Sequence, residues 1–216
     1  MQKHPPRYRT DTVDGLPADI KAYLDERFLA TLPHLDVPHA KLLVVFSGGN
    51  AMGKSTLSAK IGQELQALVL ENDRIKKCLL ELRPEQNREE RNVLTWRYSM
   101  DLYARLGSIT PNGLVVRDGL IDWYYDRILP VFDKQGYKLF IIGYDISREK
   151  REALVRKRGD TATVSADLLV SLMDEQDEHI RRFRQHYTPD ILLTDDNLFD
   201  HERVINAIRV QCSRRA

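Results

Sequence analysis

The chain has 216 residues, 42% hydrophobic and 30% charged, a balance typical of a globular protein with one sizeable α/β domain. Its formal net charge is +1, so no global charge draws it to nucleic acid or to an anionic membrane. Two distant cysteines, no apolar run of membrane-spanning length and no signal-like N-terminus favour a reducing compartment, so we expect a cytoplasmic protein without membrane contact.

The first forty residues precede the first predicted strand. Residues 1–15 are polar and contain prolines, which predicts an extended arm, and residues 16–32 have the periodicity of a helix. We therefore expect an N-terminal arm and helix over 1–40, and the main domain over 41–216. The simplest interpretation is that the helix packs on the core. The alternative is a role in binding a partner or in oligomerisation.

One segment matches the phosphate-binding pattern G-x-x-x-x-G-K-[ST]: Gly48, Gly49, Asn50, Ala51, Met52, Gly53, Lys54, Ser55 and Thr56. It follows an apolar run, residues 42–46, typical of a buried parallel strand, and it precedes a helical pattern of apolar residues. Because a glycine-rich turn at a helix N-terminus suits an anionic phosphate, we expect ATP or GTP to bind here. Lys54 is expected to reach the β- and γ-phosphates, and the Ser55 hydroxyl to ligate Mg²⁺.

A second short strand, residues 67–70, runs directly into a helix that begins near Asp73. This places Asp73 at the carboxyl end of a parallel strand, the edge of a sheet where ligands bind. A helix N-cap is the alternative interpretation of the same carboxylate. Residues 86–107 predict a helix rich in large side chains, which serves either as core packing or as one wall of an acceptor pocket.

The third predicted strand, residues 114–118, ends in Asp118, as a Walker-B strand ends in a carboxylate. We expect Asp118 to hold Mg²⁺ through water or to contact the acceptor. Residues 122–135 predict a helix that Pro130 kinks or breaks, and a fourth strand follows at 137–144. Strands and helices thus continue to alternate, as in a parallel α/β sheet.

A basic helix is predicted to begin at Ser147 and to end in a cluster of positive charges around Arg156 and Arg158. This helix end lies where a short lid over the triphosphate would be. We expect one of these two arginines to contact the phosphates, because guanidinium groups suit the charge that spreads over a transferring phosphoryl group.

The remaining elements are a helix, a strand and a closing helix. Ser165 is expected to cap one long helix that runs to about His186, followed by a strand at 189–194 and a helix at 200–212. His179 and His186 lie seven residues apart on the long helix. Exposed helix surface explains them better than a metal site does, because no third ligand converges in the sequence.

The order of elements predicts the fold. Five alternations of strand and helix indicate a three-layer α/β/α sandwich with a five-stranded parallel sheet, the fold of P-loop nucleoside triphosphate hydrolases and kinases. A GTPase is disfavoured because no Asn-Lys-x-Asp motif follows a late strand, and motor or assembly ATPases have longer chains. A compact kinase with a lid fits best.

Three segments resemble those of small phosphate-loop kinases, a group that includes phage-type polynucleotide 5′-kinase domains, chloramphenicol phosphotransferase and the zeta toxins. They are the loop 48–56, the pair Asp73 and Lys76, and the basic run 154–159 with the helix after it. The pair is similar to the family's D-x-x-R motif, in which the aspartate is the base for the acceptor hydroxyl. This chain departs from the family in that Lys76 replaces the usual arginine, and residues 1–40 have no counterpart.

The resemblance implies in-line transfer of the γ-phosphoryl group of ATP to an alcohol. Asp73 would accept the hydroxyl proton, while Lys54 and the loop amides hold the phosphates beside Mg²⁺. Arg158, with Arg156, would stabilise the transferring group when the lid closes.

The acceptor is expected to contact Asp73, Lys76 and Asp118. We favour a small hydroxyl compound, because a polynucleotide would favour a basic channel that the net charge of +1 does not supply globally. A nucleic acid 5′-hydroxyl end is the second alternative, since a local basic track could still bind it. An ATP-gated binding protein without phosphotransfer is the third. The sequence does not determine the oligomeric state.

Overall fold

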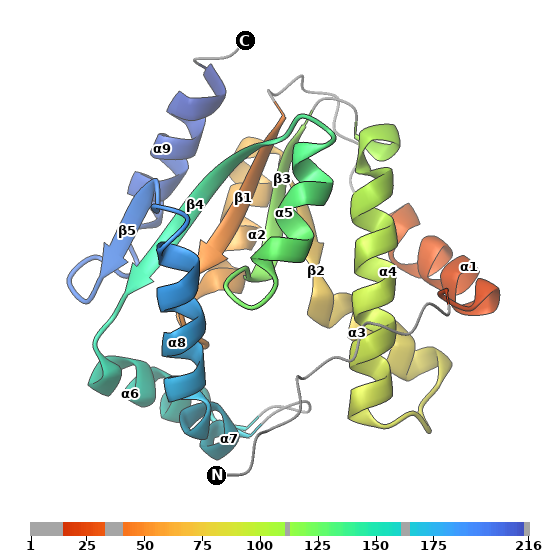
Figure 1. The fold of residues 1–216 in the computed structure, drawn as a ribbon, viewed down its shortest axis with the longest axis horizontal. Coiled ribbons are helices and arrows are strands. Elements are labelled where there is room, and N and C mark those ends of the chain that lie inside the picture. Colours follow the sequence, from red (N-terminus) through yellow and green to blue (C-terminus); the bar gives the residue numbers. More distant parts are fainter. Residues whose placement is uncertain (1–14, 33–40, 111–112, 161–164, 214–216) are drawn as a thin grey trace. The chain divides into compact units, whose positions relative to one another are not determined.

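A computed structural model of the chain describes residues 15–32, 41–110, 113–160 and 165–213. Strands and helices alternate along it, as Figure 1 shows. The arm expected over residues 1–15 lies, apart from Gly15, outside the described residues. No helix in the described segments combines the length and apolar character needed to cross a bilayer.

The described helices are α1 (Ala18–Arg27), α2 (Lys54–Leu65), α3 (Asn72–Leu82), α4 (Arg88–Ile109), α5 (Tyr125–Asp133), α6 (Arg148–Arg158), α7 (Ala166–Ser171), α8 (Met173–Arg184) and α9 (His201–Ser213), with a 3₁₀ turn at Leu29–Thr31. The described strands are β1 (Leu42–Ser47), β2 (Leu68–Glu71), β3 (Leu114–Leu120), β4 (Lys138–Asp145) and β5 (Ile191–Thr194).

The five strands form one sheet in the order β2-β3-β1-β4-β5. The pairings of β1 with β3, β1 with β4 and β4 with β5 are all parallel. All six residues of β1 are buried, as expected for a central strand that is covered on both faces. Figure 1 shows α5 and α8 in front of the sheet and α2 behind it. The predicted α/β fold with a five-stranded parallel sheet is therefore confirmed.

The helix after the phosphate loop forms for the reason that its sequence suggests. α2 buries Leu57, Ile61 and Leu65, which recur at intervals of four residues and so lie on one helix face. These side chains belong to the main hydrophobic core, together with apolar residues of β1, β3, β4, β5 and α9. This packing holds the N-terminus of α2 at the carboxyl edge of the central strand.

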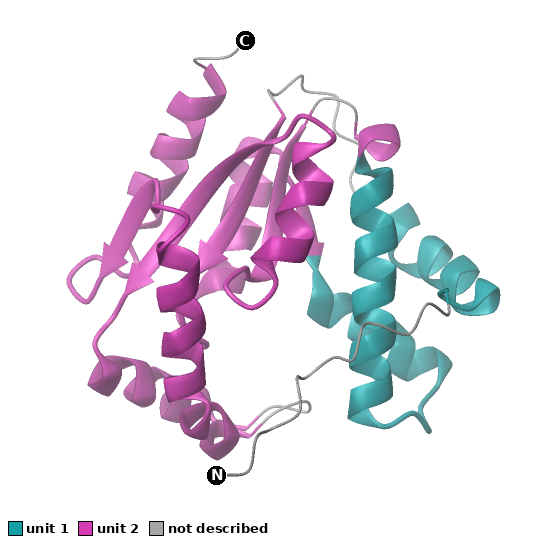
Figure 2. Cartoon of the chain, in the orientation of Figure 1, with its two compact units in different colours: residues 1–33, 71–106 teal, residues 34–70, 107–216 magenta. Residues whose placement is uncertain are grey.

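The contacts divide the chain into two compact units, coloured teal and magenta in Figure 2. The first, which we call the helical unit, comprises the described residues up to 32 together with 71–106. The second, the sheet unit, comprises 41–70 and the described part of 107–213. These units are defined by packing and are discontinuous along the chain. The boundary expected at residue 40 stays a prediction.

The helical unit has its own small core. α1 packs on α3 and buries Ile20 and Leu24. The ring of Phe28 meets Tyr98 of α4 edge to face, with centroids 6.1 Å apart, and the Tyr98 hydroxyl donates to Asp25 Oδ1 at 2.9 Å. The predicted N-terminal helix thus packs within this unit, although its α-helical part ends at Arg27.

The structure corrects the prediction for β3 and the helix that follows it. β3 does not end at Asp118 but continues to Leu120, because a register shift in its pairing with β1 lets Leu120 lie opposite Phe46. α5 continues through Pro130 without a break. Proline has no backbone N–H, so the helix loses one hydrogen bond there, but the buried side chains of Ile128 and Phe132 hold it against the core.

The long helix predicted after Ser165 is in fact two helices. The Ser165 side chain caps only α7, by accepting from the Leu168 N–H at 3.2 Å. Leu172 then has φ −94° and ψ 0°, outside the regular helical range, and α8 begins at Met173. Apolar periodicity alone did not reveal this break, because buried residues lie on both sides of it.

Candidate functional site

The phosphate-loop segment forms the turn that joins β1 to α2. Gly53, the residue before α2, has a φ of +76°, in the left-handed region that glycine adopts without strain. Gly48 has no room for a side chain, because a Cβ there would lie 2.7 Å from Cβ of Tyr144 on β4. Two of the predicted glycines are thus required by backbone geometry and close packing.

Lys54 lies at the centre of this site. Its Nζ donates to the carbonyl oxygen of Gly49 at 2.6 Å, so the side chain folds back over its own loop. Burial lowers the pKa of Lys54 to about 8, with a smaller contribution from the positive charge of Arg158. The carboxylates of Asp118 and Asp122 act in the opposite direction. The site therefore holds an ammonium that is short of compensating negative charge.

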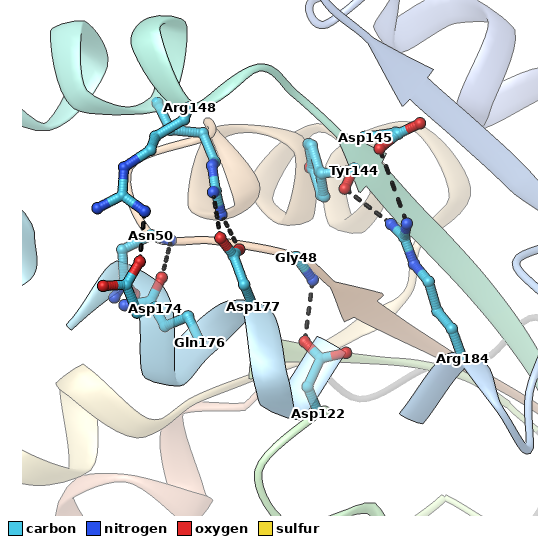
Figure 3. Close-up of polar contacts among 11 residues, drawn as sticks. Gly48, Asn50, Asp122, Tyr144, Asp145, Arg148, Asp174, Gln176, Asp177 and Arg184 are labelled. Carbon is cyan, nitrogen blue, oxygen red and sulfur yellow. Dashed lines mark hydrogen bonds and ion pairs between the residues drawn. The ribbon is translucent and has the colours of Figure 1, made fainter. Parts of the chain in front are cut away.

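Asp122 is a site residue that the sequence analysis missed. It is buried just beyond β3 and accepts from the Gly48 N–H at 2.9 Å (Figure 3). It also accepts from Ser47 Oγ at 2.7 Å, and so anchors the start of the loop. Burial raises the pKa of Asp122, and these two hydrogen bonds oppose that shift. The sequence signal for Asp122 is a carboxylate directly after the apolar Ile121, but the prediction that β3 ends at Asp118 directs attention to the earlier carboxylate.

Asp118 lies on β3 within the electrostatic reach of Lys54. Its charge also adds to the effect of burial in raising the pKa of Tyr144, the residue packed against Gly48. The structure thus brings Asp118 and Lys54 together at one edge of the sheet, as expected from the sequence. Whether Asp118 contacts a metal or an acceptor stays a prediction.

The start of α8 covers part of the loop. Gln176 is buried, and its Oε1 accepts from the backbone N–H of Asn50 at 3.4 Å (Figure 3). The same oxygen lies 3.5 Å from the position of a Cβ on Gly49. A single glutamine on an amphipathic helix gives no recognisable sequence signal, so this contact could not be predicted.

Two ion pairs join α6 to α8 above the loop. Arg151 forms a two-pronged pair with Asp177, in which the Nη2–Oδ2 distance is 2.7 Å, and Arg148 pairs with Asp174 (Figure 3). Arg151 is itself buried and packs close to Gly49. Fork-like pairing of a guanidinium with a carboxylate fixes geometry as well as charge, so these contacts set the position of α8 over the loop.

The two predicted lid arginines lie in different environments. Arg156 has a side chain that is 56% exposed; it donates to Glu152 Oε1 at 3.0 Å from Nε and lies 3.4 Å from Asp167. The hydrogen bond with Glu152 raises the pKa of Arg156. Arg158, by contrast, is close enough to Lys54 for its charge to lower the pKa of that lysine. A phosphate contact by either arginine stays a prediction.

Asp73 and Lys76 lie in the helical unit, in the first turns of α3. The Asp73 side chain is 77% exposed, and Lys76 Nζ donates to its Oδ1 at 3.1 Å. The residue at the N-cap position of α3 is Glu71, so the alternative interpretation of Asp73 as a helix cap is wrong. The predicted base and acceptor roles of this pair are untested.

The donor set suits a magnesium ion better than a transition metal. Ser55 is exposed at the start of α2, and hydroxyl and carboxylate oxygens such as those of Ser55 and Asp118 are ligands that Mg²⁺ accepts beside phosphates. Within the described segments, no group of three His, Cys, Asp or Glu side chains is placed to hold a metal ion. His179 is not simply exposed, because it stacks on Trp123 with ring centroids 4.0 Å apart.

Comparisons with known proteins agree with this geometry. The model of the AAA domain family matches residues 43–188 of the chain, whereas no curated protein matches it significantly. Among solved structures, a candidate kinase from Chloroflexus aurantiacus is similar with a TM-score of 0.59 and 16% identity, over 82% of this chain and 99% of that one.

Two further solved structures have the same fold. A chain from the PezAT chromosomal toxin-antitoxin system of Streptococcus pneumoniae has a TM-score of 0.56 and 13% identity, over 82% of this chain and 76% of that one. A gluconokinase from Sinorhizobium meliloti has a TM-score of 0.50 and 14% identity, over 81% and 94%. At these identities the likeness concerns the fold, which is that of small P-loop kinases.

Proposed function

The chain belongs to the AAA domain family and has the fold of small P-loop kinases, and from this premise we propose that it transfers the γ-phosphoryl group of ATP to a hydroxyl of a small molecule. The observation that carries the proposal is the state of Lys54. Its ammonium donates to the Gly49 carbonyl of the loop, and its pKa is lowered to about 8, chiefly by burial. A bound triphosphate supplies the negative charge that this group lacks, and it replaces the Gly49 carbonyl as the acceptor of the Nζ hydrogen bond.

The loop and its neighbours would divide the work of binding ATP. The backbone N–H groups of the loop and Lys54 hold the phosphates, while Asp122 keeps the start of the loop in place through Ser47 and Gly48. Ser55 and Asp118 would hold Mg²⁺, which neutralises charge on the β- and γ-phosphate oxygens when it is bound. Each of these residues belongs to the sheet unit.

Asp73 is the proposed base. It accepts the proton of the acceptor hydroxyl as that oxygen bonds to the γ-phosphorus and the bond from the γ-phosphorus to the bridging oxygen of ADP breaks. Its exposed side chain, held by Lys76, is accessible to an acceptor from solvent. Arg158, with Arg156, would stabilise the charge on the transferring group, and Lys76 would contact the acceptor.

A polynucleotide 5′-hydroxyl is the alternative acceptor, and two contacts in the helical unit argue against it. A basic track for a nucleic acid backbone would run along α3 and include Arg74 and Arg83. Arg74 donates to Thr31 Oγ1, and Arg83 pairs with Asp19 at 2.7 Å, so both guanidinium groups already have protein partners. A small hydroxyl acceptor makes no such demand on them.

The proposal is tested with γ-labelled ATP, Mg²⁺ and pooled acceptors: 5′-hydroxyl oligonucleotides, nucleosides, nucleotide sugars and aminoglycoside- or phenicol-type antibiotics. We expect label to move to one small-molecule pool, and Asp73→Asn to slow transfer by about 10²- to 10⁴-fold. Asp126→Asn is the matched control, because Asp126 is also exposed in the first turn of a helix, α5.

Other outcomes distinguish the alternatives. Label that moves only to the oligonucleotides would replace the small-molecule acceptor by a nucleic acid 5′ end. Tight ATP binding with no transfer to any pool would overturn the kinase and favour an ATP-gated binding protein. Full transfer by Asp73→Asn would remove Asp73 from the role of base while leaving the kinase in place.

A further inference from the structure

A stacked pair of aromatic side chains lies in the sheet unit, and the proposed function does not use it. The indole of Trp123 and the imidazole of His179 face each other, with ring centroids 4.0 Å apart and 26° between the ring planes. Trp123 lies in the turn between β3 and α5, and His179 lies on α8. Both side chains are partly exposed, so the pair is accessible to a ligand from solvent.

A second group of rings follows the pair along the same two elements. Phe183 of α8 is fully buried and meets Tyr125 of α5 edge to face, with centroids 5.3 Å apart. Tyr187 stacks on Phe183 at 5.0 Å. The buried contact between α8 and α5 is thus made by Phe183. The pair of Trp123 and His179 lies at the exposed end of this contact, where core packing explains it less well.

Each member of the pair is close in sequence to a residue that holds the phosphate loop. Trp123 directly follows Asp122, whose carboxylate accepts a 2.9 Å hydrogen bond from the loop backbone. His179 lies about one helical turn after Gln176, which accepts from the Asn50 N–H at 3.4 Å. Figure 3 shows Asp122 and Gln176 at the start of the loop. Because these connections are short, the stacked pair lies beside the start of the loop.

The start of the loop is also where the terminal phosphate is expected. Lys54, whose ammonium would reach the β- and γ-phosphates, donates to the Gly49 carbonyl at 2.6 Å. This contact places the ammonium at the start of the loop. In an in-line transfer the acceptor approaches the γ-phosphate from the side opposite the leaving ADP. The stacked pair is therefore close to the group that would be transferred, which is a position for the acceptor.

The turn that carries Trp123 is held in place by its own backbone. The Ile121 N–H donates to the Phe46 carbonyl of β1 at 2.9 Å, and the Tyr124 N–H donates to the Ile121 carbonyl at 3.1 Å. Between them, Asp122 is buried and hydrogen-bonded to the loop. Little conformational entropy is thus lost when a ligand contacts the Trp123 indole.

We propose that the acceptor carries an aromatic ring, which stacks on the pair of Trp123 and His179 while its hydroxyl group is phosphorylated. The inference rests on the proposed function and narrows the acceptor to an alcohol with a flat ring. The ring takes no part in bond making. The hydroxyl oxygen bonds to the γ-phosphorus, its proton passes to the base, and the bond to ADP breaks. An acceptor without an aromatic ring gains no comparable interaction with the pair.

The first test measures binding without phosphoryl transfer. Trp96→Phe leaves Trp123 as the sole indole, because the chain has two tryptophans. With ADP and Mg²⁺ bound, this variant is titrated with nucleosides and phenicol-type antibiotics, which carry aromatic rings, and with aminoglycosides, which do not. We expect a saturable change in Trp123 emission with one of the aromatic alcohols only. A response to aminoglycosides, or no saturable response to any aromatic alcohol, would overturn the inference.

The second test is kinetic. We expect Trp123→Ala to raise KM for the aromatic acceptor about tenfold or more, with KM for ATP unchanged and kcat altered far less. Trp123→Phe keeps a ring and should restore most of the affinity. Tyr23→Ala, which removes a partly exposed ring from α1 in the helical unit, is the matched control. Equal losses for ATP and the acceptor in Trp123→Ala would mean that the indole only packs, and would overturn the inference.

The outcomes also separate this inference from the proposed function. Label that moves only to aminoglycosides would overturn the aromatic acceptor and leave the kinase standing. A saturable response of Trp123 to an aromatic alcohol, without transfer to any acceptor, would support the ring site and overturn the kinase.

Discussion

Two aspartates at the carboxyl ends of strands illustrate two ways of building a site. Asp122, after β3 in the sheet unit, is buried and accepts two hydrogen bonds from the start of the phosphate loop. Asp73, after β2 in the helical unit, is 77% exposed and contacts Lys76. The first residue is held in place before any ligand arrives, whereas the second is left accessible. The loop is therefore preformed by packing, while the proposed base depends on a substrate for further contacts.

Removal of the Lys54 ammonium from the phosphate loop should have the largest effect on phosphoryl transfer. We expect Lys54→Met to lower kcat/KM for phosphoryl transfer by about 10²- to 10³-fold, because one donor aimed at developing charge is lost. The same variant should melt at a higher temperature than the wild type, since burial of the charged Lys54 is unfavourable without a phosphate. Kinetics and thermal melting measure the two effects, and a lower melting temperature would show that Lys54 stabilises the free protein.

The two aspartates should respond differently to the same change. Asp122→Asn leaves one of two buried donors poorly paired, so we expect it to reduce the free energy of unfolding by about 1–3 kcal/mol. Asp73→Asn removes an exposed ion pair and should change that free energy by less than about 1 kcal/mol. Urea denaturation measures both variants. Equal losses would mean that the contrast in burial does not correspond to a contrast in stability.

The pH dependence of ATP binding should report on Lys54. In the free protein its pKa is lowered to about 8 from 10.5, and a bound triphosphate raises it again, so ATP binding above pH 8 takes up a proton. We expect the dissociation constant to rise about tenfold per pH unit above about pH 8. Lys54→Arg should remove this dependence, because arginine stays protonated. Calorimetry in buffers of different ionisation enthalpy counts the protons.

Lys54 should also make the stability of the free protein depend on pH. ATP binding weakens as pH rises, whereas the contribution of Lys54 to stability increases. Between about pH 8 and 10.5 the unfolded chain binds more protons at Lys54 than the folded protein does, so this residue makes unfolding less favourable as pH rises through that window. The effect is absent in Lys54→Met. Thermal melting of both proteins without nucleotide across this range isolates it, and parallel curves would contradict the lowered pKa.

The smallest predicted effect separates the two lid arginines. The charge of Arg158 lowers the pKa of Lys54, so Arg158→Gln should move the onset of the pH effect on ATP binding upward by a fraction of a unit. Arg156→Gln should not move it, because Arg156 is paired with Glu152 on the exposed surface of α6. The midpoint of the pH profile of ATP binding distinguishes the two variants. Identical shifts in both would contradict the conclusion that Arg158, and not Arg156, acts on Lys54.

Local sequence patterns predicted much of the fold and the centre of the site. The phosphate loop, its flanking strand and helix, and the position of Lys54 were all predicted, because each depends on residues within a few positions of one another. The same patterns failed at Leu172, where a regular helix ends within an unbroken apolar pattern. At Pro130, of the two predicted outcomes, a kink or a break, the break is wrong because α5 continues through the proline.

The sequence by itself determined the alternation of strands and helices and the chemistry of the loop, since backbone periodicity and glycine geometry act locally. Only the tertiary structure decided which distant side chains meet that loop. Asp122 lies 75 residues after Ser47, and Gln176 lies 126 residues after Asn50, yet each forms a hydrogen bond there. Such pairs depend on the order of strands in the sheet and on the packing of α8, and they become fixed when the whole chain buries its core.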